Sequence, residues 1–330
     1  MTKVKSAVVG VGALGKHHLR WLSRIDESEL IGLYDIDGER AKSLADEYGV
    51  RSFGNLEELC DSVEAASIVV STSAHYEVAA ALMSKGIHCL IEKPVTSTIE
   101  QSEELQKIAR DQNVKVAVGQ IERFNPAVVA LADLDISPAF IEVHRMAAFD
   151  PRGTDVAVVL DLMIHDIDLI LRFVESKVSD IQASAVAVIS DQADIANARL
   201  TFENGAVANL TASRISLKPM RKLRIFQPSG YYSLDLAERR ADIYRMAGPG
   251  DTDGMRLPLG KSGQDIIYTR KTGNDQDMLE SELRSFLQAV VEDKPVAVGL
   301  GEASEALRIA IEIERIGTES IRRFGKVQTP

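Results

Sequence analysis

Short apolar runs and longer amphipathic segments alternate over the first 120 residues of the chain. The apolar runs predict strands at residues 4–10, 30–34, 67–71, 88–91 and 114–119. Helical periodicity separates them at residues 16–25, 38–48, 55–60, 75–85 and 98–112. Strands that alternate with helices indicate βαβ units. We therefore predict an α/β domain with a doubly wound parallel sheet over residues 1–120.

The pattern changes in residues 121–330, where residues 121–135 predict a linker helix. Strand-like runs then occur at residues 139–149, 178–189, 195–202, 206–215, 221–226 and 231–236. Most of them follow one another without intervening helices, which indicates an antiparallel sheet. Residues 247–274 predict a long irregular stretch, and amphipathic helices are expected at 279–291 and 301–316.

The first predicted strand runs into a glycine-rich turn, Gly10-Val-Gly12-Ala-Leu-Gly15, and a helix follows. In this setting Gly10 permits the turn, Gly12 lets the backbone approach a pyrophosphate, and Gly15 allows close helix packing. The second strand ends in Asp35, where a carboxylate is expected to meet the adenosine ribose. We therefore predict a Rossmann dinucleotide site; the alternative is a glycine-rich turn beside a surface aspartate.

The predicted cofactor is NAD rather than NADP. Asp35 would repel a 2′-phosphate, and Ile36 after it offers no compensating charge. Arg40 on the next helix is the residue most able to change this preference. The side chains and loop residues expected beside the cofactor at the strand ends are Gly10, Gly12, Ala13, Leu14, Gly15, Asp35, Ser71, Thr72, His75 and Lys93. For His75 the alternative is a first-turn helix position without a ligand.

A polar stripe marks the otherwise apolar helix predicted at residues 155–173. The stripe spans about 60° at about 100° per residue. Its members are Asp161, His165, Asp168 and Arg172, and Asp166 is the other polar residue among apolar neighbours. Such a stripe is costly to desolvate unless it is paired or faces a cavity. It is either a satisfied internal network or one wall of an active site.

Composition narrows the classes of partner. The 330 residues carry 38 basic and 49 acidic side chains, a formal charge of −11, which argues against nucleic acid or an anionic membrane surface. Cys60 and Cys89 lack metal-ligand spacing, so we expect a reducing, cytoplasmic compartment and no metal site. We predict neither a signal peptide nor a membrane span.

Three motifs together resemble the Gfo/Idh/MocA oxidoreductase family: the GVGALG loop, the turn Glu92-Lys93-Pro94, and Asp161-x-x-x-His165. The resemblance covers essentially the whole chain. It implies a Rossmann domain, then a C-terminal α/β domain for substrate binding and oligomerisation with an open, mostly antiparallel sheet. It also implies a cis peptide before Pro94 and sugar or cyclitol chemistry with NAD or NADP. Some members of the family are non-catalytic sensors.

The resemblance adds residues to the expected site. It implies that Glu92 and Pro94 lie at the cofactor, and that Arg123 and Asn125 belong to a cofactor-proximal linker; a capped connecting helix is the alternative there. Alcohol oxidation needs hydride loss to a nicotinamide and proton loss to a base. Lys93, Asp161 and His165 are the expected catalytic residues, because histidine titrates near neutral pH and an aspartate one turn away orients it.

The expected substrate is a nucleotide sugar, with the 3-hydroxyl of UDP-N-acetylglucosamine as the leading candidate. The runs around 120–126 and 152–156 resemble sugar-nucleotide 3-dehydrogenases. A diphosphate needs cations, and the basic residues of the second half are Arg123, Arg145, Arg152, Arg214, Lys218, Arg221 and Lys222. Arg123, Arg145 and Arg152, with Lys93, Asp161 and His165, are the predicted substrate contacts. One alternative is that most of these cations pair with nearby carboxylates; others are an inositol or free-sugar dehydrogenase, and a sensor.

A homodimer or homotetramer is expected through the C-terminal sheet. One sheet face should carry the helix at 155–173. Apolar alternation at Ala183, Ala185 and Ala187 suggests a second apolar face that a partner would cover.

Overall fold

The computed structural model describes residues 3–149, 156–260, 263–273 and 276–328. Its contacts divide the chain into two compact units. The first contains Met1–Ile121 and Gln276–Leu307, and the second contains Glu122–Asp275 and Arg308–Pro330. The hydrophobic pattern divided the chain once, near residue 120, and did not predict that Gln276–Leu307 returns to the first unit.

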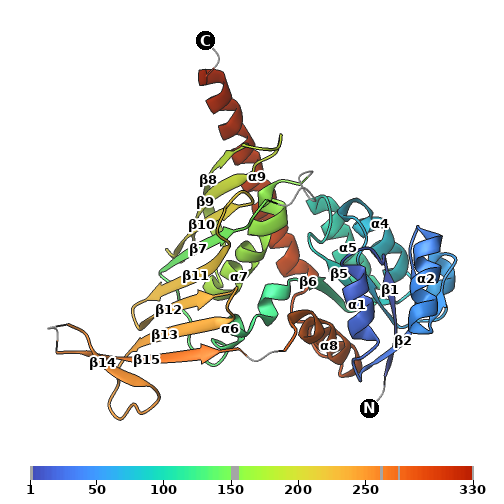
Figure 1. Cartoon of the computed structure of the whole chain (residues 1–330), viewed down its shortest axis with the longest axis horizontal. Helices are drawn as coiled ribbons and strands as arrows, with labels where there is room; N and C mark the ends of the chain where they lie inside the picture. Colours follow the sequence, from blue (N-terminus) through green and yellow to red (C-terminus); the bar gives the residue numbers. More distant parts are fainter. Residues whose placement is uncertain (1–2, 150–155, 261–262, 274–275, 329–330) are drawn as a thin grey trace. The chain divides into compact units, whose positions relative to one another are not determined.

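The first unit is built on a six-stranded, wholly parallel sheet in the order β3-β2-β1-β4-β5-β6. Its strands are β1 (Val4–Val9), β2 (Ser28–Tyr34), β3 (Arg51–Ser52), β4 (Ala65–Ile68), β5 (His88–Glu92) and β6 (Val116–Gly119). Its helices are α1 (Gly15–Leu22), α2 (Gly38–Tyr48), α3 (Leu56–Cys60), α4 (Thr72–Met83), α5 (Ile99–Asp111) and α8 (Met278–Val291). Figure 1 shows helices on both faces of this sheet. The predicted Rossmann fold is confirmed.

Helix α8 packs on the first unit through an apolar face. Leu283, Phe286 and Leu287 join the core that Val4 and Leu19 form. Asp277 caps the helix by accepting hydrogen bonds from the backbone N–H groups of its first turn. Periodicity predicted this helix but not the surface that it covers, because an apolar stripe does not name its partner.

The second unit contains a nine-stranded sheet in the order β14-β15-β13-β12-β11-β7-β10-β9-β8. Among the strand pairs of the described residues only β7–β10 is parallel, so the predicted open, mostly antiparallel sheet is confirmed. Its strands are β7 (Phe140–Met146), β8 (Val178–Val186), β9 (Ile195–Phe202), β10 (Val207–Ser213), β11 (Met220–Gln227), β12 (Gly230–Asp235), β13 (Arg240–Met246), β14 (Met255–Pro258) and β15 (Asp265–Thr272). The prediction of a long irregular stretch at 247–274 was wrong in part, because these residues contain β14 and β15.

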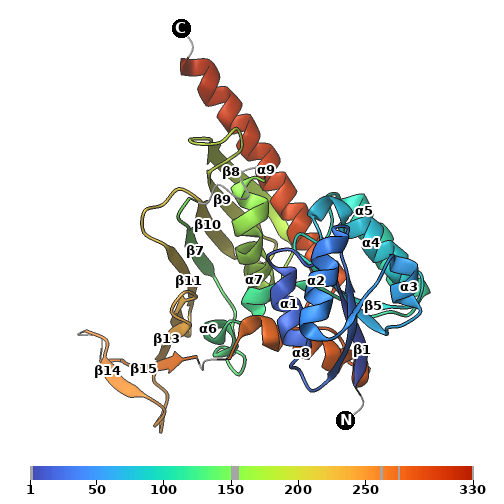
Figure 2. The same ribbon diagram turned by 45° about the vertical axis from the view of Figure 1, so that its right-hand side comes forward.

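The helical elements of the second unit begin at the linker and cover one face of the sheet, as Figures 1 and 2 show for α7. They are η1 (Ile121–Phe124), which starts at the last residue of the first unit, α6 (Pro126–Val129), the π-helical turn η2 (Val159–Met163) and α7 (Ile164–Val174). Helix α9 (Leu300–Gln328) begins in the first unit and ends in the second. The single linker helix expected at 121–135 is therefore two shorter elements.

The opposite face of the large sheet carries a row of aromatic rings. Centroids of neighbouring rings lie 4.8–5.6 Å apart, with interplanar angles of 19–30°. The rings are Phe140, Phe226, Tyr231, Tyr244 and Tyr268, one from each of five neighbouring strands. The expected apolar stripe was misplaced: Ala183 and Ala185 pair with the buried Ala198 and Ala196, away from this face.

Candidate functional site

The glycine-rich loop has the close approaches that a dinucleotide loop requires. Gly10 has a φ of +87°, and a Cβ there would lie 2.5 Å from the carbonyl oxygen of Val69. A Cβ on Gly15 would collide with the carbonyl of Gly10. At Gly12, by contrast, an added Cβ would meet only Arg40, at 4.0 Å. The loop is thus packed closely against backbone at Gly10 and Gly15 and leaves free space at Gly12. Ala13 and Leu14 continue the loop toward α1. This geometry fits a pyrophosphate at the α1 N-terminus.

Asp35 lies just after β2, and its carboxylate is oriented by backbone groups. Val11 N–H donates to Oδ2 at 2.7 Å, and Asp37 N–H donates to Oδ1 at 2.9 Å. The Nη1 atom of Arg40 lies 3.6 Å from the same Oδ2, and its Nη2 atom lies 2.7 Å from Asp37. Ile36 is almost fully exposed. The end of β2 therefore presents the oriented carboxylate of Asp35. The nearest cation, Arg40, also pairs with the carboxylate of Asp37.

We expect NAD to bind at least about tenfold more tightly than NADP, because Arg40 is already engaged by Asp35 and Asp37. Titration of both cofactors measures this preference. The variant Asp37→Asn weakens one partner of Arg40 and should narrow the difference, whereas Glu39→Gln on the same turn should not. Tighter binding of NADP by the native chain would contradict the assignment.

The Glu92-Lys93-Pro94 turn lies at the carboxyl end of β5. The predicted cis peptide joins Lys93 to Pro94. The Lys93 N–H donates to Oε2 of Glu92 at 3.2 Å. A Cβ on Gly119 would lie 3.0 Å from the Glu92 carboxylate, so this glycine leaves the space that the carboxylate occupies. Lys93 itself is partly buried.

The residues at the end of β4 divide into two groups. Ser71 is the N-cap residue of α4 and Thr72 begins that helix, both partly or fully accessible. His75, in the first turn of the same helix, is only 1% exposed. Its Nδ1 atom is 2.8 Å from the carbonyl oxygen of Pro94, and its Nε2 atom is 3.2 Å from that of Val70. Burial lowers the pKa of His75, against the opposing effect of these carbonyls.

The predicted polar helix contains a π-helical turn that periodicity did not predict. Asp161 lies in η2, and His165 lies in the first turn of α7. Both side chains are partly buried. The other two members of the stripe differ: Asp168 is buried, whereas Arg172 is 56% exposed and pairs with Glu175 at 2.8 Å. A wider turn within a helix is frequent at functional sites.

The linker is attached to α7 by an ion pair. Arg123 donates through two nitrogens to the two carboxylate oxygens of Asp168, one of these contacts being 2.8 Å long. Asn125 is buried within the second unit. Its amide nitrogen donates to Glu122 and to the carbonyl of Leu236, and its oxygen accepts from the first turn of α6.

Arg145 is the centre of a buried cluster of charges. Its guanidinium is 3% exposed and donates to both oxygens of Asp166 and to Glu122 at 2.7–3.0 Å. Burial raises the pKa of Asp166, and Arg145 opposes that shift. Burial works against the charged form of Arg145 as well, but the two carboxylates raise its pKa. The sequence showed Asp166 as an isolated charge among apolar residues. Glu122 is 23 positions from Arg145, and no sequence pattern predicted that these two residues pair.

The electrostatic argument for a diphosphate is weakened by these pairs. Among the described basic residues of the predicted set, most contact a carboxylate. The alternative interpretation expected such pairs on the surface, but the side chains of Arg123, Arg145 and Arg214 are at most 8% exposed. The pairs are Arg123–Asp168, Arg145–Asp166, Arg214–Asp194, Arg221–Glu122 and Lys222–Asp235. Arg221 and Lys222 stay 49% and 40% exposed, and Lys218 is exposed. Arg152 lies outside the described residues.

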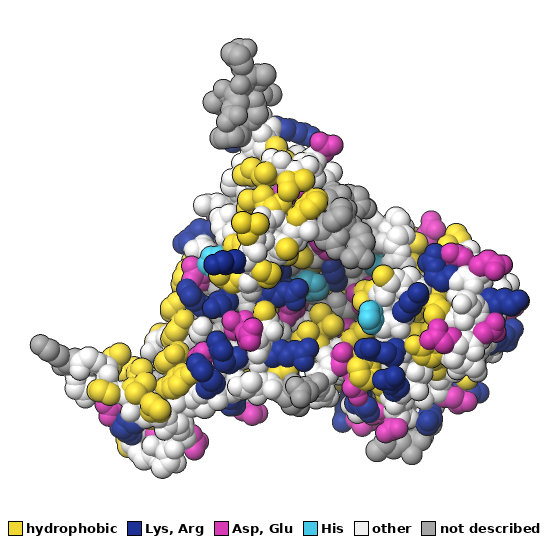
Figure 3. Space-filling view, in the orientation of Figure 1, with side chains coloured by type: hydrophobic (Ala, Val, Ile, Leu, Met, Phe, Trp, Pro, Cys, Tyr) yellow, Lys and Arg dark blue, Asp and Glu magenta, His cyan; other side chains and the backbone are white. Residues whose placement is uncertain are grey.

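Basic and acidic side chains both occur on the face of the molecule that Figure 3 shows. Within the described ranges, no group of three or more His, Cys, Asp or Glu side chains is arranged to hold a metal ion. The described helices also include none with the length and apolarity that crossing a bilayer requires.

A parallel dinucleotide-binding sheet with an open glycine loop and an oriented acidic residue defines a class of nicotinamide-dependent oxidoreductases. Residues 4–120 match the model of the GFO_IDH_MocA oxidoreductase family with its NAD-binding Rossmann fold, and residues 142–233 match the family's C-terminal domain model. The chain belongs to the Gfo/Idh/MocA oxidoreductase family, as its motifs predicted. The NAD cofactor is confirmed with it.

Relatives of the chain include several sugar and cyclitol dehydrogenases. A UDP-N-acetylglucosamine 3-dehydrogenase from Acidithiobacillus ferrooxidans is 36% identical over 95% of this chain and 98% of its own length. A solved structure of that enzyme superposes with a TM-score of 0.88, at 34% identity, over 97% of this chain and 99% of the other. An inositol 2-dehydrogenase from Rhizobium meliloti is 24% identical over 93% of this chain and 94% of its own.

Proposed function

We propose that this chain oxidises the 3-hydroxyl of UDP-N-acetylglucosamine to a ketone with NAD. The observation that carries the proposal is the 36% identity over 95% of the chain to a UDP-N-acetylglucosamine 3-dehydrogenase, against 24% to the inositol 2-dehydrogenase. The chain has the Lys93 of the Glu-Lys-Pro turn and the Asp161 and His165 of the helix. A sensor on the same fold has no chemical need for these three residues.

The reaction removes a hydride and a proton from one secondary alcohol. Bound NAD supplies the hydride acceptor. In our proposal the Lys93 ammonium binds the substrate oxygen and favours its alkoxide character, and Asp161 orients His165 and stabilises its protonated form. His165 takes the hydroxyl proton when Lys93 is the ammonium; Lys93 can take that proton only if it starts as the neutral amine. Gly12 and the α1 N-terminus would hold the pyrophosphate of the cofactor, and Asp35 would hold its adenosine ribose.

The basic side chains that could bind the diphosphate of the sugar nucleotide are chosen by their solvent exposure. Arg123 and Arg145 donate to carboxylates within the second unit, so we now propose them as supports of α7 rather than as the main diphosphate contacts. Lys218 and Arg221 are the accessible members of the set that remain for the diphosphate. Lys222 is accessible too, but it pairs with His144 in the register of β11 and β7 and lies on the sheet face opposite α7. All three residues lie at or near the start of β11.

The substrate assignment is tested by incubating the enzyme and NAD separately with UDP-N-acetylglucosamine, myo-inositol and glucose. An aminotransferase with glutamate removes any ketone and pulls the reaction forward. We expect NADH only with the nucleotide sugar. NADH only with inositol or glucose would support the runner-up, a free cyclitol or sugar dehydrogenase. NADH with none of the three would favour the sensor or another substrate.

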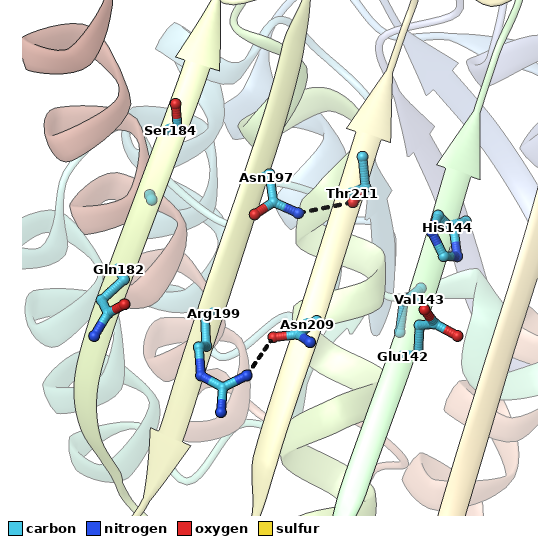
Figure 4. A pocket seen from close by; sticks show the side chains of 10 residues that line it. Glu142, Val143, His144, Gln182, Ser184, Asn197, Arg199, Asn209 and Thr211 are labelled. Carbon is cyan, nitrogen blue, oxygen red and sulfur yellow. Dashed lines mark hydrogen bonds between the residues drawn. The ribbon is translucent and has the colours of Figure 1, made fainter.

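We also propose that the protein is a cytoplasmic homo-oligomer joined through the large sheet. The aromatic row lies on the sheet face opposite α7. Beside it is a depression of about 480 Å³, lined mainly by polar side chains such as Asn197, Arg199, Asn209 and Thr211. Figure 4 shows these side chains in front of the sheet and the helices behind it. A broad face of aromatic and hydrogen-bonding groups is suited to a protein interface.

Light scattering at micromolar concentration is expected to give at least the mass of a dimer. Tyr231→Lys in the middle of the aromatic row should weaken association by more than about tenfold, since it places a charge in a desolvated contact. Tyr76→Lys, on α4 of the first unit, is the matched control. A native monomer at this concentration would contradict the proposal.

A further inference from the structure

The turn that carries Lys93 is contacted on one side by a buried histidine of α1. His18 is 0% exposed, and its Nε2 atom lies 3.1 Å from Oε1 of Glu92. Its Nδ1 atom lies 2.7 Å from the hydroxyl oxygen of Ser67 in β4. This Glu92 contact does not have hydrogen-bond geometry, so it is an ion-pair approach of the ring to the carboxylate. A carboxylate can only accept, so the approach is favourable when Nε2 carries a proton, and the serine hydroxyl then donates to Nδ1.

A second buried histidine contacts the other side of the same turn. The Nδ1 atom of His75 faces the carbonyl oxygen of Pro94 at 2.8 Å. Nε2 faces a carbonyl as well, that of Val70 at 3.2 Å. Both carbonyls only accept, so we assign the proton of the neutral ring to Nδ1, which makes the shorter contact. The two residues that flank Lys93 in sequence, Glu92 and Pro94, are thus each contacted by an imidazole, from α1 and α4 respectively.

We propose that His18 and His75 are positioning residues that together hold the backbone on both sides of Lys93. A lysine ammonium is at the end of a flexible four-carbon side chain, so the part of the residue that the fold can fix is its backbone and Cα. The Glu92 carboxylate connects His18 to the Lys93 N–H through its second oxygen. Both histidines belong to helices that begin at the proposed cofactor-binding edge. Their contacts therefore connect the backbone of Lys93 to the helices that follow the cofactor-binding loops. This inference rests on the catalytic role proposed for Lys93.

Amide side chains can separate the contact with the turn from the other contact of each ring. An asparagine amide reaches the position of histidine Nδ1, and a glutamine amide reaches that of Nε2. His18→Gln and His75→Asn therefore keep a donor toward the turn. His18→Asn and His75→Gln instead keep a group toward Ser67 and Val70, the contacts that do not involve the turn.

The two positions should then rank the same two amino acids in opposite order. We expect His18→Asn and His75→Gln to lower kcat by about 10- to 100-fold, as for a displaced catalytic group. His18→Gln and His75→Asn should stay within about threefold of the native chain. Quenching of the single tryptophan, Trp21, by NADH should give dissociation constants within about threefold for all four variants. A general packing defect predicts no such reversal, so the same ranking at both positions, or equal kcat values, would overturn the inference.

Native turnover of UDP-N-acetylglucosamine and of myo-inositol is measured first, because its absence counts against the proposed function alone. Amide hydrogen exchange of residues 89–97 then tests the positioning without any substrate. Exchange should rise in His18→Asn and His75→Gln and stay native in His18→Gln and His75→Asn. Native exchange in all four variants would overturn the inference whatever the substrate is.

Discussion

Replacing Lys93 with methionine is expected to lower kcat by about 10²- to 10⁴-fold, the range in which a proton-handling group contributes. Methionine keeps the unbranched stem and removes the cation that is proposed to bind the alcohol oxygen. His165→Asn is expected to have an effect of the same order, because asparagine cannot take up the hydroxyl proton. The dissociation constant of NAD should change by less than about threefold, since neither residue is assigned to the pyrophosphate or the adenosine.

Lys107→Met is the matched control for the first variant, because Lys107 is exposed on α5. It should turn over like the native chain. The corresponding control for His165→Asn is His17→Asn, an exposed histidine on α1. Near-native turnover by Lys93→Met or His165→Asn would show that the role assigned to that residue is wrong.

Replacing Arg145 with methionine is expected to destabilise the second unit by about 3–5 kcal/mol, the usual cost of removing one partner from a buried ion pair. Asp166 and Glu122, whose side chains are 2% and 4% exposed, would stay buried without the guanidinium that now donates hydrogen bonds to both of them. Urea unfolding measures the change. Since Asp166 follows His165 and lies on α7, kcat should fall as well, under conditions where the variant is still folded.

An exposed pair on the same helix provides the comparison. Arg172 and Glu175 have 56% and 72% exposed side chains, and such pairs contribute at most about 1 kcal/mol. Arg172→Met should therefore leave the unfolding midpoint nearly unchanged. Equal destabilisation by Arg145→Met and Arg172→Met would contradict the importance given to the buried cluster.

The Rossmann unit was predictable because its strands are buried on both faces and therefore read as short apolar runs. Strands β14 and β15 were missed for the opposite reason. They form a hairpin at the sheet edge with largely accessible side chains, such as Met255 at 61% exposure, and glycines with positive φ flank them. Edge strands of this kind have little hydrophobic alternation to detect.

The candidate site was predictable where a local motif carries it. Gly10 to Gly15, Glu92 to Pro94, and Asp161 with His165 each lie within a few positions of one another. Pairings over long separations left no trace, as for Arg123 and Asp168, which are 45 residues apart. His18 is a partial exception: with Gly15, Leu19 and Leu22 it forms the buried face of α1. A histidine on such a face three residues after the glycine motif was a signal that periodicity could have identified.

The π-helical turn shows a limit of helical periodicity. A wheel drawn at about 100° per residue placed Asp161 and Arg172 in one stripe. The wider turn at Val159–Met163 changes the angular position of Asp161 relative to α7. Sequence spacing alone does not distinguish an α-helical turn from a π-helical one.

Hydride transfer from C3 of the sugar is the central claim, and deuterium at that carbon tests it most directly. The enzyme is incubated with NAD and UDP-N-acetylglucosamine deuterated at C3, and the reduced cofactor is analysed by mass spectrometry and NMR. The account predicts one deuterium at C4 of the nicotinamide ring and a 3-keto sugar nucleotide as the other product. Unlabelled NADH from this substrate, or a ketone at another carbon, would contradict it.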